Sequence, residues 1–145
     1  MTGAKGAKGA RVRSGLAALL LTALAFGLAA CGGGSSGPGI SDVTLALSVN
    51  AATRQPIERT SHFPLDTGEV FVSLKVSDAA PGAKLEASWR HEGKEIVAYE
   101  RDVDGTRYAA LSITRPANGW PPGDYEVVLS LDGKHTKRAK FAIGP

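Results

Sequence analysis

The sequence predicts an all-β fold, an antiparallel β-sandwich of about seven strands that follows a leader and a flexible linker. From Asp42 to the end of the 145-residue chain, apolar and polar residues alternate with a period of two. This alternation is typical of strands with one buried face. Turn-forming residues recur between the alternating segments at intervals of roughly 8 to 15 residues. No window of helical length after the leader shows a 3.6-residue period.

The strands can be placed one by one from these patterns. The expected strands cover residues 43–49, 70–76, 85–90, 95–99, 107–114, 125–131 and 139–143. Residues 91–94 and the pair Asp132-Gly133 predict tight turns, because glycine permits the positive φ that such turns need. Residues 50–68 contain two prolines and no clean alternation, so we expect a short edge strand there, near residues 57–60.

The first 30 residues have the pattern of a cleaved signal peptide. A basic start is followed by an apolar run from Leu16 to Ala30, about fifteen residues, whereas a membrane-spanning helix needs about 20. Residues 31–39 hold the single cysteine and a Gly/Ser-rich linker, which behaves as a flexible coil. Residues 40–145 then form the folded domain, which is long enough for one hydrophobic core.

The charge of the mature chain argues against binding to nucleic acid. The whole chain carries 17 basic and 14 acidic residues, a net charge of +3. Four of the basic residues precede the cleavage point and every acidic residue follows it, which leaves 13 basic against 14 acidic residues. A nucleic-acid-binding surface needs an excess of positive charge, and the mature chain has none.

The segment Leu28-Ala29-Ala30-Cys31 indicates an attachment point, because a lone thiol cannot form an internal disulfide. It resembles the lipobox of bacterial lipoproteins. The resemblance implies diacylation of Cys31, cleavage before it and acylation of the new amino terminus. In Gram-negative lipoproteins, Gly32 rather than Asp at the next position implies delivery to the outer membrane, facing the periplasm. The alternative is a secreted protein cleaved after Ala30 without a lipid.

Three residues of the folded domain carry a second resemblance. Trp89 lies on the third predicted strand, and Tyr125 begins the penultimate strand in Gly123-Asp124-Tyr125. Val127 stands two residues further on, where a true immunoglobulin domain carries its second cysteine. The domain resembles bacterial immunoglobulin-like and fibronectin-III-like modules. The resemblance implies that Trp89 is buried in the core and puts Tyr125 in the place of the tyrosine corner. This likeness implies a fold and specifies no activity.

Residues that could carry chemistry are dispersed along the chain. No metal-ligand spacing joins the three histidines, which are His62, His91 and His135. Ser35 and Ser36 lie in the linker and cannot build an acyl-transfer triad. Asp102 and Asp104 flank Val103 but lack the further oxygen ligands of a calcium loop. We therefore expect neither an enzyme nor a bound metal or cofactor.

The remaining candidates concern binding. The basic run from Lys134 to Lys140 is expected to discourage edge-to-edge aggregation, with binding of anionic lipid headgroups or polysaccharide as the alternative. Trp120 precedes Pro121 in a loop and either caps the core or stands exposed as a binding anchor. We expect a monomeric, non-catalytic envelope protein that binds a protein or glycan. The alternative is an enzyme inhibitor or accessory subunit acting through residues 50–68 and 115–124.

Overall fold

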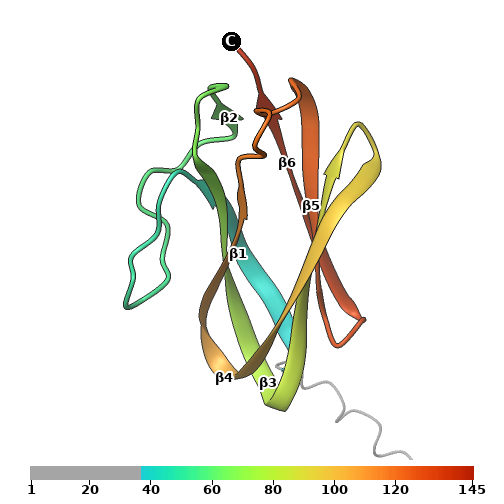
Figure 1. Ribbon diagram of the computed structural model, residues 1–145. Coiled ribbons are helices and arrows are strands. Elements are labelled where there is room, and N and C mark those ends of the chain that lie inside the picture. The colour runs from blue at the N-terminus through green and yellow to red at the C-terminus, as the bar shows by residue number, and fades with distance from the viewer. Residues whose placement is uncertain (1–36) are drawn as a thin grey trace, which may run out of the picture. The chain divides into compact units, whose positions relative to one another are not determined.

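The computed structural model describes residues 37–145 (Figure 1), and this part of the chain is all-β with no helix. It contains the strands β1 (Gly39–Ala46), β2 (His62–Phe63), β3 (Glu69–His91), β4 (Lys94–Thr114), β5 (Gly123–Leu131) and β6 (His135–Ile143). The predicted signal peptide, Ser35, Ser36 and Cys31 with its lipobox lie outside the described residues. No helix able to cross a membrane occurs within residues 37–145.

The six strands form one curled sheet, visible in Figure 1. Their order is β1-β3-β5-β6-β2, and β4 pairs with β3 beside this path. All pairs are antiparallel except β2 and β6, where His62 and Phe63 lie parallel to Ala142 and Ile143. The all-β prediction is confirmed. The strand count and the purely antiparallel pairing differ from expectation, because the sheet has six strands and is mixed.

The count differs because β3 and β4 each continue through a bend. Within β3, residues 71–77 pair with β1 and residues 69–76 pair with the second half of β4. Residues 85–91 pair with the first half of β4 and with β5. The bends contain Asp78, Gly82 and Gly105, all at positive φ. A bend interrupts the alternation of a strand just as a turn does. The sequence pattern therefore predicts two short strands where the structure has one long, bent strand.

The region from β1 to β2 also departs from the expected pattern. Leu45 and Ala46 are both buried, and Leu47, which the period of two places on the same face as Leu45, is 38% exposed. A register shift between Ser41 and Thr44 breaks the alternation of β1. Residues 46–59 then form a hairpin, closed by bridges from Ala46 to Arg59 and from Val49 to Pro56. The short strand expected near residues 57–60 is instead β2, at His62–Phe63.

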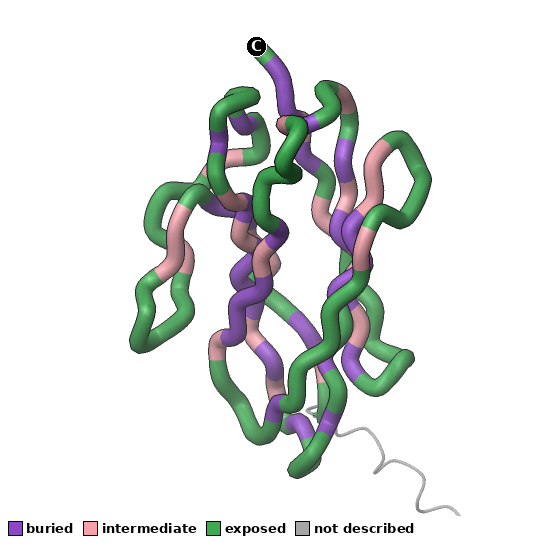
Figure 2. Tube along the Cα trace, in the orientation of Figure 1, coloured by how far each residue is buried: buried purple, intermediate pink, exposed green. Residues whose placement is uncertain are grey.

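The core lies inside the curl of the sheet, and buried residues alternate with exposed ones along its strands (Figure 2). Trp89 is fully buried, as predicted. The ring of Phe141 contacts three other aromatic rings, edge-on with Phe63 and Trp89 and stacked with Tyr125 at 5.2 Å between centroids. Such aromatic pairs contribute about 0.5–1.5 kcal/mol each beyond the area that they bury. This cluster joins the start of β5, at Tyr125, to the end of β6, at Phe141.

Candidate functional site

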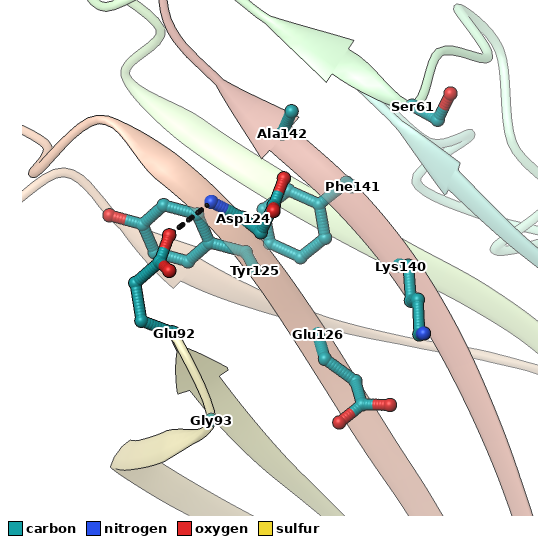
Figure 3. Close-up of a pocket in the computed structure, with 9 residues that line it drawn as sticks. All are labelled: Ser61, Glu92, Gly93, Asp124, Tyr125, Glu126, Lys140, Phe141 and Ala142. Carbon is teal, nitrogen blue, oxygen red and sulfur yellow. Dashed lines mark hydrogen bonds between the residues drawn. The ribbon is translucent and has the colours of Figure 1, made fainter.

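A pocket of about 510 Å³, lined by both polar and apolar groups, lies across the β5 and β6 strands, near the turn that joins β3 to β4 (Figure 3). We call it the β5–β6 pocket. Its lining residues are Ser61, Glu92, Gly93, Asp124, Tyr125, Glu126, Lys140, Phe141 and Ala142. Four elements contribute to it, so the pocket exists only in the folded chain.

One wall of the pocket is the tight turn between β3 and β4. Glu92 and Gly93 have φ values of 49° and 84°, the positive values that a two-residue hairpin turn requires at both central positions. The backbone N–H of Glu92 donates to the carbonyl of Asp124 at 2.9 Å. In return, Oε2 of Glu92 accepts the backbone N–H of Asp124 at 2.8 Å. The turn predicted at residues 91–94 is thereby attached to the start of β5.

Gly123 makes this attachment possible. It has a φ of +135°, and a Cβ at this position would lie 2.4 Å from Oε2 of Glu92. An L-amino acid would be strained here in its backbone, and its Cβ would displace the carboxylate of Glu92. The glycine therefore lets the carboxylate of Glu92 approach the backbone of β5.

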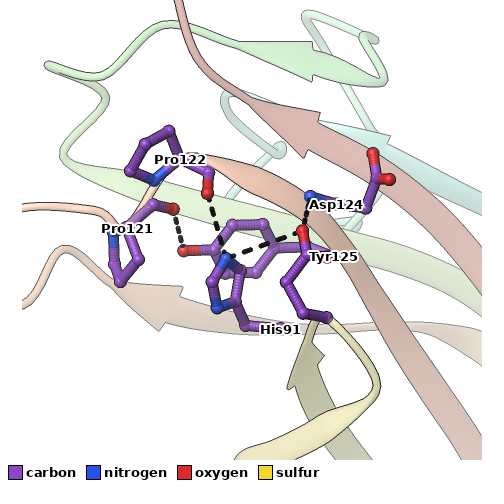
Figure 4. A network of polar contacts seen from close by, with 6 residues as sticks. His91, Pro121, Pro122, Asp124 and Tyr125 are labelled. Atoms are coloured by element: carbon purple, nitrogen blue, oxygen red, sulfur yellow. Dashed lines mark hydrogen bonds and ion pairs between the residues drawn. The ribbon is translucent and has the colours of Figure 1, made fainter.

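Tyr125 and His91 hold the loop before β5, as Figure 4 shows. The hydroxyl of Tyr125 donates to the carbonyl of Pro121 at 2.5 Å. Nε2 of His91 lies 3.1 Å from the carbonyl oxygen of Pro122, and the His91 ring packs on Tyr125 with centroids 4.6 Å apart. Burial, and secondarily the charge of Glu92, raise the pKa of Tyr125 above its ordinary value. The neutral phenol is thus the form that the folded state favours.

The open side of the pocket presents both signs of charge. Asp124 and Lys140 are exposed, and Glu126 lies opposite Lys140 in the register of β5 and β6. Glu126 also lies 3.4 Å from the guanidinium of Arg138, outside the pocket lining. Because these side chains stand on paired strands, their spacing is set by the sheet and not by a mobile loop. The arrangement can bind a polar ligand through ion pairs and hydrogen bonds.

The loop residue Trp120 is buried and is not part of the pocket. It is 4% exposed, and its indole N–H donates to the carbonyl of Thr67 at 2.6 Å. Its ring lies edge-on to Tyr125, with centroids 6.1 Å apart. This is the geometry that the capping interpretation requires. A binding role for Trp120 stays a prediction, and in this structure the indole offers little surface to a partner.

The other residues singled out in the sequence do not gather at one place. His62 is exposed on β2 and His135 is exposed at the start of β6. Asp102 forms an ion pair with Lys84, and Asp104 forms one with Arg107 at 2.7 Å. Within residues 37–145, no group of three or more histidine, cysteine or acidic side chains is placed to hold a metal ion. The basic run from Lys134 to Lys140 lies mostly exposed along β6.

Sequence reasoning placed Glu92 in the tight turn at residues 91–94 and assigned it no further role. Glu92 and Asp124 lie 32 positions apart, and no local pattern joins them. The sequence did contain two relevant segments. Glu92-Gly93 places a carboxylate in a tight turn, and Gly123-Asp124 places a glycine at the start of a strand, where a carboxylate can approach the backbone. They become informative only after the strands that carry the two segments are known to be neighbours.

Comparison with known proteins adds little. No family model and no curated protein matches the chain. One similar solved structure is the Pseudomonas fluorescens alkylpurine DNA glycosylase AlkC bound to DNA containing an abasic site analog, with a TM-score of 0.48 and 10% identity over 76% of this chain and 31% of that chain. Another is a beta-glucosidase from Listeria innocua in complex with glucose, with a TM-score of 0.41 and 7% identity over 77% of this chain and 17% of that chain. The chain thus spans under a third of the length of each, and neither activity is transferred to it.

Proposed function

We propose that this protein is a lipid-anchored lipoprotein of the bacterial cell envelope, which presents a non-catalytic immunoglobulin-like module to a protein or glycan partner. The anchor is supported by the segment Leu28-Ala29-Ala30-Cys31, which follows a basic start and an apolar run of signal-peptide length. Gly32 supports delivery to the outer membrane, with the module facing the periplasm.

The immunoglobulin-like assignment is supported by the strand register. Divided at its two bends, the sheet yields one layer of β1 with the first half of β3 and the second half of β4. The other layer holds the second half of β3, the first half of β4, β5 and β6. Buried Trp89 and the bond from the Tyr125 hydroxyl to the Pro121 carbonyl, four residues upstream, agree with the core tryptophan and tyrosine corner of such sandwiches.

The binding function is supported by one observation, the hydrogen bonds that connect the walls of the β5–β6 pocket. Its turn is attached to β5 by two hydrogen bonds between Glu92 and Asp124, and Tyr125 is tied to the preceding loop. Groups held in place before binding lose less conformational entropy when a ligand arrives. The backbone positions of Asp124 and Lys140, whose exposed side chains carry opposite charges, are therefore set before a polar partner arrives.

Crosslinking in intact envelopes tests both parts of the proposal. The wild-type chain should label with palmitate, fractionate with the membrane and crosslink to a defined partner. Cys31→Ala should lose the label and leave an uncleaved or a soluble species, because it lacks the acyl chains, which supply about 0.8 kcal/mol per buried CH₂. A Cys31→Ala chain that still labels and fractionates normally would overturn the lipoprotein assignment.

The pocket is tested in the same assay with variants that stay lipidated. Asp124→Ala and Lys140→Ala should each weaken crosslinking to that partner, whereas Lys137→Ala should not. Lys137 is the matched control, because it is exposed on the same strand and lies outside the pocket lining. Equal crosslinking by all three variants would place the binding surface elsewhere, without affecting the anchor.

A further inference from the structure

We propose that the free edge of β4 binds an extended acidic peptide, which adds to the sheet as a strand and places its carboxylates against Arg54 and Arg101. This site is separate from the β5–β6 pocket and does not depend on the lipid anchor. The two halves of β4 run toward each other and meet at the bend near Gly105 (Figure 1). Two hollows, of about 430 and 510 Å³, lie along the space between these halves and share Arg54 and Arg101 in their linings.

The backbone of β4 supplies the first requirement, an unpaired strand edge. Within residues 37–145, β4 pairs only with β3 along its 21 residues. An edge strand leaves a row of N–H and C=O groups without partners, and an extended peptide can pair with that row. The first half of β4 is largely exposed in Figure 2, so the edge is accessible.

Two cations supply the second requirement. The described residues place no carboxylate within ion-pair distance of Arg54 or Arg101, whereas Arg107 and Lys84 nearby are each paired with an aspartate. Both hollows are partly walled by buried apolar residues, namely Leu111 in one and Val103 in the other. Charges beside low-dielectric walls attract counter-ions more strongly than charges on an open surface. Carboxylates suit them, because a guanidinium can bind a carboxylate through two parallel hydrogen bonds.

Arg54 is held in place by its own loop. Its φ is 65°, a left-handed conformation that non-glycine residues seldom adopt. Asn50 Oδ1 accepts the N–H groups of Ala52 and Thr53, both at 2.8 Å, and fixes the turn before it. The hydroxyl of the fully buried Ser73 donates to the carbonyl of Arg54 at 2.7 Å. The backbone of Arg54 is therefore pinned against β3, next to the hollows.

The acidic residues of β4 do not cancel this arrangement. Glu100 lines one hollow and Asp102 lines the other. Side chains alternate between the two faces of a strand, so both carboxylates stand on the face opposite to Tyr99 and Arg101. Asp102 is already paired with Lys84. A peptide that alternates acidic with β-branched residues fits this edge. All of its acidic side chains fall on the one face that carries Arg101, and its β-branched residues favour an extended strand.

The test uses the full-length chain in detergent and a fluorescent eight-residue peptide of alternating Glu and Val. Fluorescence polarisation should show binding that weakens as salt concentration rises. Arg54→Gln and Arg101→Gln should each weaken binding roughly tenfold or more, since hydrogen bonds between charged groups contribute most. Lys137→Gln, which removes the same charge outside the hollows, should leave binding unchanged.

Two further probes decide between the peptide and other occupants. The same peptide, N-methylated at alternate residues, keeps its charges but cannot pair with a strand edge, and it should bind much more weakly. Equal binding of the N-methylated peptide, equal loss in Lys137→Gln, or no binding of the Glu/Val peptide would each overturn the proposal. Tighter binding of an acidic polysaccharide, or a dimer in sedimentation that the peptide cannot dissociate, would assign the edge to a different occupant and would also overturn it.

Discussion

Tyr125 joins the core to the candidate site through contacts on every side. Its ring stacks on Phe141 and meets Trp120 edge-on, while His91 packs on it. Its hydroxyl donates a hydrogen bond to the carbonyl of Pro121. One side chain therefore fixes the loop before β5 and, through β5, the position of Asp124 in the pocket.

Replacing Tyr125 by Phe should lower the free energy of unfolding by about 1 kcal/mol at neutral pH, because one hydrogen bond is lost and the ring remains. The difference in the free energy of unfolding between wild type and Tyr125→Phe should depend on pH. The folded state raises the pKa of Tyr125, so it retains the phenolic proton at a pH where the unfolded chain, with a pKa of about 10, loses it. This contribution to stability is complete below pH of about 10 and is lost as pH rises through the folded-state pKa.

Denaturant unfolding of both proteins from pH 8 upward measures this effect. The stability difference between wild type and Tyr125→Phe should narrow as pH rises above about 10. Tyr99→Phe, which removes an exposed hydroxyl, is the control and should remain close to wild type throughout. A difference between wild type and Tyr125→Phe that stays constant with pH would contradict the assigned cause.

At the scale of elements, the turns determine how the strands approach one another. The β5–β6 turn has Asp132 and Gly133 at φ values of 53° and 71°, and the β3–β4 turn has positive values at Glu92 and Gly93. Both have the backbone that suits the right-handed twist of a hairpin. The β3–β4 turn has a second function, since it carries the carboxylate that binds the start of β5.

Gly123→Ala should therefore destabilise the domain by about 1–3 kcal/mol, the usual range for a strained backbone conformation. The new methyl group would also displace the Glu92 carboxylate from the N–H of Asp124. Thermal melting followed by circular dichroism gives the size of the effect. Gly68→Ala is the control, because no atom would lie within 4 Å of the new Cβ and its φ is not positive. Equal melting temperatures for the two variants would show that the backbone conformation of Gly123 does not require glycine.

At the scale of the whole molecule, the curled sheet behaves as a single unit because its longest strands cross both halves. β3 pairs with β1 at one end and with β5 at the other, and β4 follows it through the bend. Residues from both halves belong to one hydrophobic core cluster. Neither half can lose its packing without exposing the apolar side chains of the other.

We expect one cooperative unfolding transition for the whole domain. Leu74→Ala lies in the first half of β3 and should cost about 2–5 kcal/mol, and Trp89→Ala lies in the second half and should cost about 3–5 kcal/mol. Both residues are fully buried. Circular dichroism and tryptophan fluorescence should report coincident transitions in wild type and in each variant. Ile57→Ala, at an exposed position, should change little. Separate transitions for the two probes would show that the halves unfold independently.

The sequence by itself determined the all-β class, the two tight turns and the burial of Trp89. These features depend on local patterns, namely a period of two, glycine at positive φ and a tryptophan on an apolar face. The same patterns placed the residues of the β5–β6 pocket on strands and turns. They did not predict the contact between Glu92 and Asp124. A local pattern predicts whether a segment forms a strand or a turn, but it does not predict which other segment lies next to it.

Only the tertiary structure decided the continuity of β3 and β4, the parallel pairing of β2 with β6, and the position of Arg54 against Ser73. Strand order and register are set by packing and by the closure of loops between distant segments. The alternation within a strand is the same for any neighbour, whereas the free energy of the fold depends on which neighbour is present. For that reason the strands were predictable from the sequence, and their partners, and the sites between them, were not.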